Sequence, residues 1–141
     1  MSYRKGVSCI IRKNNKFLIL HRTKNWRGWE FLKGGIKQGE TERQALRREL
    51  KEETGNIRYS IKKTPYKIKY KWKKHYMKDN RMFSGSAESL HVADFLGNKK
   101  VKIDKTEHDG FKWVNAKDAL RKISYEDRKK AFRYALRKYF N

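Results

Sequence analysis

Residues 34–55, GGIKQGETERQALRRELKEETG, constrain the fold more than any other stretch of the chain. Three glycines within its first six residues can turn sharply and let a ligand approach the backbone, because glycine has no Cβ atom. Thr41 followed three residues later by Gln44 fits a capping box, and Gly55 is typical of a helix end. The stretch therefore predicts a glycine loop and then a short helix that begins at Thr41 and stops at Gly55.

The predicted helix carries clustered glutamates. Glu49, Glu52 and Glu53 stand at positions i, i+3 and i+4, which places them within an arc of roughly 100° on one face. Like charges so placed repel, and a divalent cation would remove the penalty. Carboxylate oxygens completed by waters and substrate phosphates favour magnesium over zinc. Arg48 can hold a carboxylate through a charge-assisted pair, and the alternative interpretation is an ordinary solvated acidic face.

The spacing of this stretch resembles the Nudix box, Gly-x5-Glu-x7-Arg-Glu-U-x-Glu-Glu-x-Gly-U, in which U is a bulky aliphatic residue. Asn56 stands where the last apolar residue of the box belongs, and Ile57 follows it. That departure affects the entry into the next strand and leaves the metal positions intact. The residues that fall on the box in register are Gly34, Glu40, Arg48, Glu49, Leu50, Glu52, Glu53 and Gly55.

The resemblance implies an α/β (α+β) fold, the Nudix-type α/β/α sandwich, formed by one domain over residues 1–141. A mixed β-sheet would lie between the box helix and the C-terminal helix. The implied reaction is hydrolysis of a nucleoside diphosphate linked to another moiety, by attack of an activated water on phosphorus. The implied cofactor is Mg²⁺, with Mn²⁺ as the alternative.

The resemblance also assigns roles within the box. Glu49 and Glu53 would be the first metal ligands, and Glu52 would be a further ligand or the general base. A backbone carbonyl in the loop around Gly34 would add an oxygen ligand. Arg48 would orient Glu49 for catalysis.

Two segments outside the box extend the resemblance. Lys33, directly before the glycines, is placed to grip a phosphate, although leucine stands at position 32 where the family usually has proline. Residues 107–114, EHDGFKWV, resemble a segment of the diadenosine tetraphosphate hydrolase branch. Glu107 would supply a further carboxylate to the metal and to catalysis, and Asp109 is a weaker candidate.

Apolar periodicity predicts the rest of the secondary structure. Cys9 lies in an apolar run and reads as a buried thiol, and Pro65 reads as an edge or turn residue between two strand segments. We expect strands over 3–12, 16–22, 57–74 and 90–96, a loop over 75–80, a flexible connection over 84–86, a short helix capped by Asn115 and a longer helix opening at 124–127.

Aromatic residues alternate with lysines in the region that follows the box. Aromatic rings can stack bases while cations hold phosphates, and core packing is the alternative for each ring. The C-terminal helix shows a run of cations that begins at Arg128 and reads as a solvated face or an RNA-facing stripe. The candidates for substrate binding by stacking are Tyr70, Trp72, Tyr76 and Phe83.

Charge is the unusual feature of the composition, because 38 Lys and Arg residues face 15 Asp and Glu residues, for a formal net charge of +23. Such an excess predicts anionic partners, either RNA or a nucleoside polyphosphate. A lysine-rich lineage or high intracellular salt is the alternative explanation. No stretch approaches a membrane span, so we expect no membrane contact and a soluble, cytoplasmic protein.

Three functions follow from these observations. The spacing of the box and residues 107–114 favour hydrolysis of dinucleoside tetraphosphates. The charge favours removal of pyrophosphate from 5′-triphosphorylated RNA. A catalytically silent nucleic-acid-binding module is the alternative from another class, although the intact box glutamates argue against it.

Overall fold

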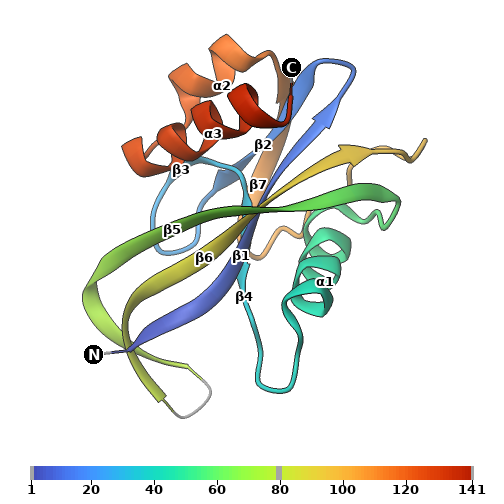
Figure 1. Cartoon of the computed structure of the whole chain (residues 1–141). Coiled ribbons are helices and arrows are strands. Elements are labelled where there is room, and N and C mark those ends of the chain that lie inside the picture. Colours follow the sequence, from blue (N-terminus) through green and yellow to red (C-terminus); the bar gives the residue numbers. More distant parts are fainter. Residues whose placement is uncertain (1, 79–80, 141) are drawn as a thin grey trace.

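The computed structural model describes residues 2–78 and 81–140 (Figure 1). Strands dominate the first two thirds of the chain, and two helices close it. The elements are β1 (Tyr3–Lys13), β2 (Lys16–Arg22), β3 (Gly28–Glu30), β4 (Leu32–Gly35), α1 (Glu42–Thr54), β5 (Tyr59–Lys78), β6 (Arg81–Phe95), β7 (His108–Val114), α2 (Ala116–Lys122) and α3 (Glu126–Lys138).

The described strands form one mixed sheet with β1 near its centre. β1 pairs in parallel with β6 on one side, and antiparallel with β4 and β2 on the other. β5 pairs antiparallel with β6 and forms an edge, while β2 also pairs with β3 and β7. This topology sets the glycines of β4 beside residues 6 and 7 of β1.

Helices cover both faces of the sheet, as Figure 1 shows with α1 on one side and α2 and α3 on the other. Successive residues of β1 alternate between the two layers, because side chains on a strand point to opposite faces. Ile10 packs with Phe132 and Ala135 of α3, whereas Cys9 packs with Leu46 of α1. The predicted α/β/α sandwich with a mixed sheet is confirmed.

The predicted helix of residues 41–55 is present with both of its caps. The Thr41 side chain accepts from the backbone N–H of Gln44, and the Gln44 side chain accepts from the backbone N–H of Thr41. Gly55 ends the helix with a left-handed φ of 72°. The first strand pair turns at Asn14 and Asn15, both with positive φ, and Asn115 caps α2 as predicted.

The region after the box differs from its prediction, because it forms one long β-hairpin. β5 is continuous across Pro65, which sits at an irregularity between Lys63 and Lys67 on this edge strand. The loop expected over 75–80 is wrong for residues 75–78, which belong to β5; residues 79–80 lie outside the described residues.

The flexible connection expected over 84–86 is also wrong, because these residues lie buried inside β6. A Cβ at position 85 would lie 2.3 Å from the carbonyl oxygen of Tyr70 and 2.7 Å from the ring of Tyr3. Gly85 therefore serves close packing of neighbouring strands.

Asn56, which replaces an aliphatic residue of the box, is buried at the exit of α1. Its side-chain nitrogen donates to the carbonyl oxygens of Thr54 at 3.0 Å and Lys100 at 3.4 Å. These bonds tie the helix exit to the segment after β6. None of the described helices is long and apolar enough to cross a membrane.

Candidate active site

Arg48 of α1 fastens the glycine loop to the helix. Its Nε and Nη2 donate to the two carboxylate oxygens of Glu40 at 2.7 and 3.0 Å. Nη2 also donates to the carbonyl oxygen of Gly35 at 2.9 Å, and Nη1 donates to Oε1 of Glu49 at 2.7 Å. The hydrogen bond from Arg48 lowers the pKa of Glu40 to about 2, so this carboxylate stays ionised. The contact between Arg48 and Glu49 expected from the sequence is present.

Gly34 lets the carboxylate of Glu49 lie directly against the loop. A Cβ at position 34 would lie 2.1 Å from Cδ and 2.3 Å from Oε1 of Glu49. Burial raises the pKa of Glu49 to about 7. The charges of Glu53 and Glu52 also raise this pKa, whereas Arg48 lowers it. A nearby cation would favour the ionised form of such a carboxylate.

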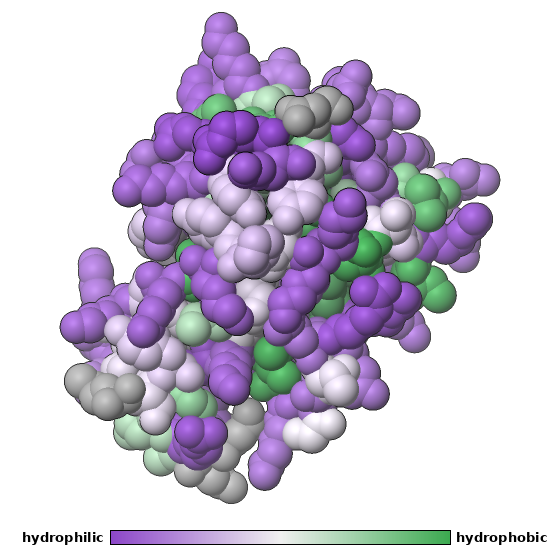
Figure 2. Space-filling view, viewed as in Figure 1, coloured by the Kyte–Doolittle hydropathy of each residue, from purple (hydrophilic) through white to green (hydrophobic). Residues whose placement is uncertain are grey.

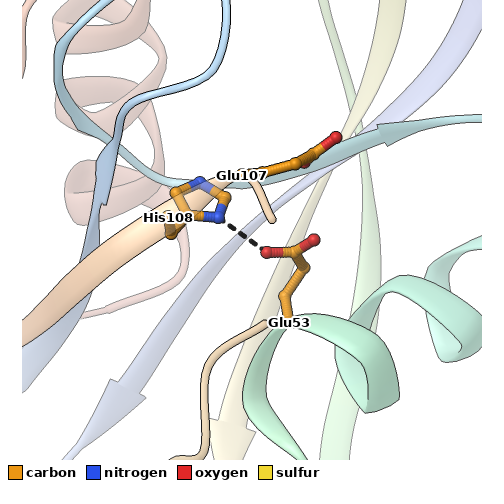
Figure 3. Close-up of side chains that lie close together, drawn as sticks. All are labelled: Glu53, Glu107 and His108. Carbon is orange, nitrogen blue, oxygen red and sulfur yellow. Dashed lines mark ion pairs between the residues drawn. The ribbon is translucent and has the colours of Figure 1, made fainter. Parts of the chain in front are cut away.

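Glu53 faces a buried histidine at the start of β7. Nδ1 of His108 lies 2.7 Å from Oε2 of Glu53 (Figure 3). Nε2 of His108 lies 2.8 Å from Oε2 of Glu30. Glu30 also accepts from Nη1 of Arg22 at 3.1 Å. Burial opposes protonation of His108, but the hydrogen bond with Glu30 and the charges of Glu30 and Glu53 raise its pKa to about 9. A protonated His108 thus stabilises both carboxylates.

Glu107 joins this group from the turn before β7. A carboxylate oxygen of Glu53, one of Glu107 and a ring nitrogen of His108 lie within 4.8 Å of one another. A protonated His108 cannot ligate a metal, so the two carboxylates are the ligands that this group offers. Figure 3 shows Glu53 reaching from α1, while Glu107 comes from the turn before β7 and His108 from its first residue. Asp109, the weaker candidate, lies elsewhere, with Oδ1 at 2.6 Å from Nδ1 of His21.

These residues fit a divalent metal. Oε2 of Glu53 is shielded from solvent and lacks an aligned hydrogen bond among the described residues, despite its short ion pair with His108. The Glu52 side chain is 44% exposed, and its one ion pair among the described residues is a 3.4 Å contact with Nη1 of Arg48. Oxygen ligands of this kind, together with the close approach at Gly34, suit Mg²⁺ or Mn²⁺.

Lys33 belongs to a second charge network, on the sheet face opposite α1. Its Nζ donates to Oη of Tyr70 at 3.4 Å, and this hydroxyl donates to Oε2 of Glu88 at 3.1 Å. Arg128 of α3 pairs with both carboxylate oxygens of Glu88, at 2.9 Å for Nη2 to Oε2. Burial would raise the pKa of Glu88, but Arg128 lowers it below its ordinary value.

The prediction that Arg128 lies in a solvated or RNA-facing stripe is therefore wrong. Its side chain is only 8% exposed, and its charge is compensated by Glu88, whose side chain is 5% exposed. A helix face can contain one buried cation among solvated ones, and the periodicity of charges alone does not distinguish them.

The four aromatic candidates for base stacking lie along the β5–β6 hairpin, but they differ in exposure and in contacts. Phe83 is 6% exposed, so its ring is not open to a base, which corrects that assignment. Tyr70 is tied into the network of Glu88. Trp72 and Tyr76 contact each other edge to face with ring centroids 5.5 Å apart, and Tyr76 is 47% exposed.

Sequence reasoning missed three charged or titratable residues, namely His108, Glu30 and Glu88. Within residues 107–114 a role was assigned to Glu107 and, more weakly, to Asp109, although His108 between them makes the close contact with Glu53. A signal was available, because Glu30 and Glu88 interrupt segments that are otherwise apolar or small. A buried carboxylate needs a cationic partner, and such interruptions point to one.

The chain matches the NUDIX domain model over residues 2–135. It therefore belongs to the NUDIX family, and it is a hydrolase that acts on pyrophosphate bonds. Two curated relatives are the RNA pyrophosphohydrolases of a Nitratiruptor species and a Marinomonas species. The first is 29% identical over 131 residues, 87% of this chain and 84% of that protein. The second is 30% identical over 122 residues, 80% of this chain and 76% of that protein.

Solved structures share the fold at lower identity. The E. coli dihydroneopterin triphosphate pyrophosphohydrolase superposes with a TM-score of 0.77 at 20% identity, covering 95% of this chain and 97% of that one. A C. elegans Ap4A hydrolase superposes with a TM-score of 0.68 at 21% identity, covering 92% and 93%. The family prediction is confirmed, and the specific likeness to the diadenosine tetraphosphate branch stays a prediction.

Proposed function

We propose that this hydrolase removes pyrophosphate from the 5′ end of triphosphorylated RNA. The observation that carries this proposal is the net charge of +23, which far exceeds what a small nucleotide needs. The names of the aligned relatives, RNA pyrophosphohydrolases, support the same substrate. The glutamates of the active site are negatively charged, so the positive excess lies on the rest of the protein.

In this proposal the residues around α1 hold the metal and the reacting phosphates. Glu49 and Glu53 are the inner carboxylates, joined by Glu107 and by a backbone carbonyl of the Gly34 loop. Mg²⁺ at such a site would lower the pKa of a bound water and neutralise charge on the leaving oxygen. Glu52, the most exposed glutamate of α1, is a further ligand or accepts a proton from the attacking water.

The second network would position the phosphates. Lys33 presents its ammonium group on the strand that leads into the glycine loop, and Tyr70 restrains it. The buried pair of Glu88 and Arg128 in turn fixes the Tyr70 hydroxyl. Lys33 is thereby held near the expected position of a substrate phosphate instead of moving freely in solvent.

A direct comparison of substrates tests the proposal. The purified protein with Mg²⁺ is given 5′-triphosphorylated RNA and diadenosine tetraphosphate at equal concentrations, and the products are separated. We expect preferential release of pyrophosphate from RNA, abolished in Glu53→Gln. Preferential hydrolysis of the dinucleotide would overturn the proposal, and RNA binding without any turnover would indicate a silent binding module.

Hydrolysis of dinucleoside tetraphosphates is the second candidate, and the segment at residues 107–114 favours it. Salt separates the two, because a long RNA would contact phosphates beyond the active site. We expect kcat/KM for RNA to fall steeply as salt rises and kcat/KM for a dinucleotide to fall less.

A further inference from the structure

The outward half of β5 carries four alternate lysines, Lys67, Lys69, Lys71 and Lys73, here called the lysine row. The first three pair with Ser89, Ala87 and Gly85 of β6 and share one face, and Lys73 follows in the irregular stretch between Lys71 and Tyr76. All four are exposed. Alternate residues of a strand share one face and lie about 6.8 Å apart. That interval is close to the spacing of phosphates along an extended single-stranded nucleic acid.

No carboxylate forms an ion pair with the lysine row within the described part of the chain. Lys67 donates to the hydroxyl of Ser89 at 3.0 Å, whereas Lys63, just outside the row, lies 3.2 Å from Oε1 of Glu42. Adjacent like charges on a sheet are unfavourable unless an anion neutralises them. The row thus differs from Arg48 and Arg128, which carboxylates compensate within the protein.

A partly buried aromatic ring lies beside the row. Tyr3 of β1 and Lys71 both pair with Gly85 of β6, and the Tyr3 ring packs against that glycine. Nζ of Lys69 lies 4.4 Å from the centroid of the Tyr3 ring. Cations around an aromatic surface suit a nucleic acid, since the ring can stack a base while the cations contact phosphates.

The inner end of the row lies beside the box helix. Ser89, which accepts from Lys67, itself donates to Oε2 of Glu42 in the first turn of α1 at 3.2 Å. From there the row follows the β5–β6 hairpin outward, and Figure 1 shows this hairpin extending past the N-terminal end of β1. Hydrophilic side chains also cover most of the face seen in Figure 2.

We infer that the lysine row binds the backbone of an RNA chain downstream of the 5′ end that is held in the active site. This inference rests on the proposed function for the orientation of the RNA. The row would contribute affinity without base specificity, because it contacts phosphates. It would leave the chemical step unchanged.

Binding of a 5′-hydroxyl RNA tests the row independently of catalysis, because that RNA lacks the scissile bond. Fluorescence anisotropy would compare wild type with Lys69→Ser/Lys71→Ser/Lys73→Ser. The matched control removes three exposed cations of α3, as Lys130→Ser/Arg137→Ser/Lys138→Ser. We expect the row variant to bind at least about tenfold more weakly. The slope of log affinity against log salt concentration should fall in magnitude by about 2 units, since each single-strand phosphate contact contributes about 0.7.

The control should change binding much less, and replacing the same three row lysines by arginine should preserve it. Equal weakening in both serine variants would overturn the inference, because affinity would then follow net charge alone. No weakening in either would overturn it too. Circular dichroism and thermal melting would establish that the variants are folded.

Kinetics then separate this inference from the proposed function. With a triphosphorylated dinucleotide and an RNA of about 20 nucleotides, the row variant should raise KM for the longer substrate only and leave kcat unchanged. A fall in kcat on both substrates would contradict a role confined to the downstream chain. If wild type hydrolyses neither substrate but still binds RNA through the row, the proposed function fails and the binding site stands.

Discussion

The box region and the β5–β6 hairpin use charge in opposite ways. Around α1, Arg48 donates to Glu40, Glu49 and the carbonyl of Gly35, so a single guanidinium fixes the loop on the helix. Along β5, the lysine row has no carboxylate partner among the described residues. Paired charges hold atoms in place for chemistry, and unpaired charges remain available to an anionic partner.

The largest effect should come from removing a carboxylate of the site. Glu53→Gln deletes the charge that faces His108, and we expect kcat to fall on the order of a thousandfold, because a metal ligand acts in the transition state. Pyrophosphate release in Mg²⁺ measures this effect. Glu126→Gln, an exposed glutamate of α3, is the matched control and should keep full activity. A loss below tenfold would show that Glu53 is not part of the metal site.

Breaking the buried pair of Arg128 and Glu88 should affect stability more than any change to the lysine row. Arg128→Met leaves Glu88 charged and buried without its partner, and we expect a loss of about 3–5 kcal/mol in the free energy of unfolding. Urea denaturation measures this loss. The double variant Glu88→Leu/Arg128→Met should recover most of it, since an apolar pair can replace a buried ion pair.

The exposed pair of Arg133 and Glu126, 3.0 Å apart, provides the contrast. Arg133→Ala should cost less than about 1 kcal/mol, because solvent screens exposed pairs. If both arginine variants lost the same stability, burial would not explain the difference between the pairs.

A substitution at Gly34 tests the close approach of the loop and Glu49. Gly34→Ala would put a Cβ 2.1 Å from Cδ of Glu49, and a displaced ligand should reduce kcat/KM about a hundredfold. Gly110→Ala is the control, because a Cβ there would meet nothing within 4 Å. Near-normal activity of the Gly34 variant would mean that the loop can shift freely.

Acid should weaken the protein through Glu88. Burial raises the pKa of Glu88, but Arg128 lowers it overall, so the folded carboxyl titrates below its unfolded value. The unfolded state then binds more protons in acid, and stability rises with pH there. The contribution of the Glu88–Arg128 pair to stability is complete above the pKa that Glu88 has in the unfolded state. It is lost as pH falls through the pKa that Glu88 has in the folded state.

Urea midpoints over a pH series would measure this linkage. Glu88→Gln should be less stable than wild type at neutral pH, and the difference should shrink as pH falls. If the difference in stability between Glu88→Gln and wild type stayed constant with pH, Glu88 would not contribute to the loss of stability in acid.

The box was predictable because its determinants are local. The capping of α1 by Thr41, its end at Gly55 and the shared face of Glu49 and Glu53 all follow from spacing within one helix. The hairpin was mispredicted because Gly85 reads as a flexible residue in the sequence. A glycine is in fact needed there because the carbonyl oxygen of Tyr70 and the ring of Tyr3, which lies 82 residues away along the chain, leave no room for a Cβ.

The charge networks escaped prediction for a related reason. His108 lies 78 residues from Glu30, and Arg128 lies 40 residues from Glu88. Only the folding of the sheet brings them together. A sequence shows that Glu30 and Glu88 interrupt their strands, but it does not show which cation compensates each carboxylate.

The smallest expected effect completes the contrast between the two regions. Lys71→Ser removes one member of the lysine row, and we expect the free energy of unfolding to change by less than about 0.5 kcal/mol. The sign should be stabilising at low salt, because the substitution relieves repulsion between neighbouring lysines, and the gain should vanish as salt screens the charges. Urea denaturation at two salt concentrations measures both effects. A clear loss of stability would mean that Lys71 has a structural role. The lysine row would then be explained by folding and not by binding of an anionic partner.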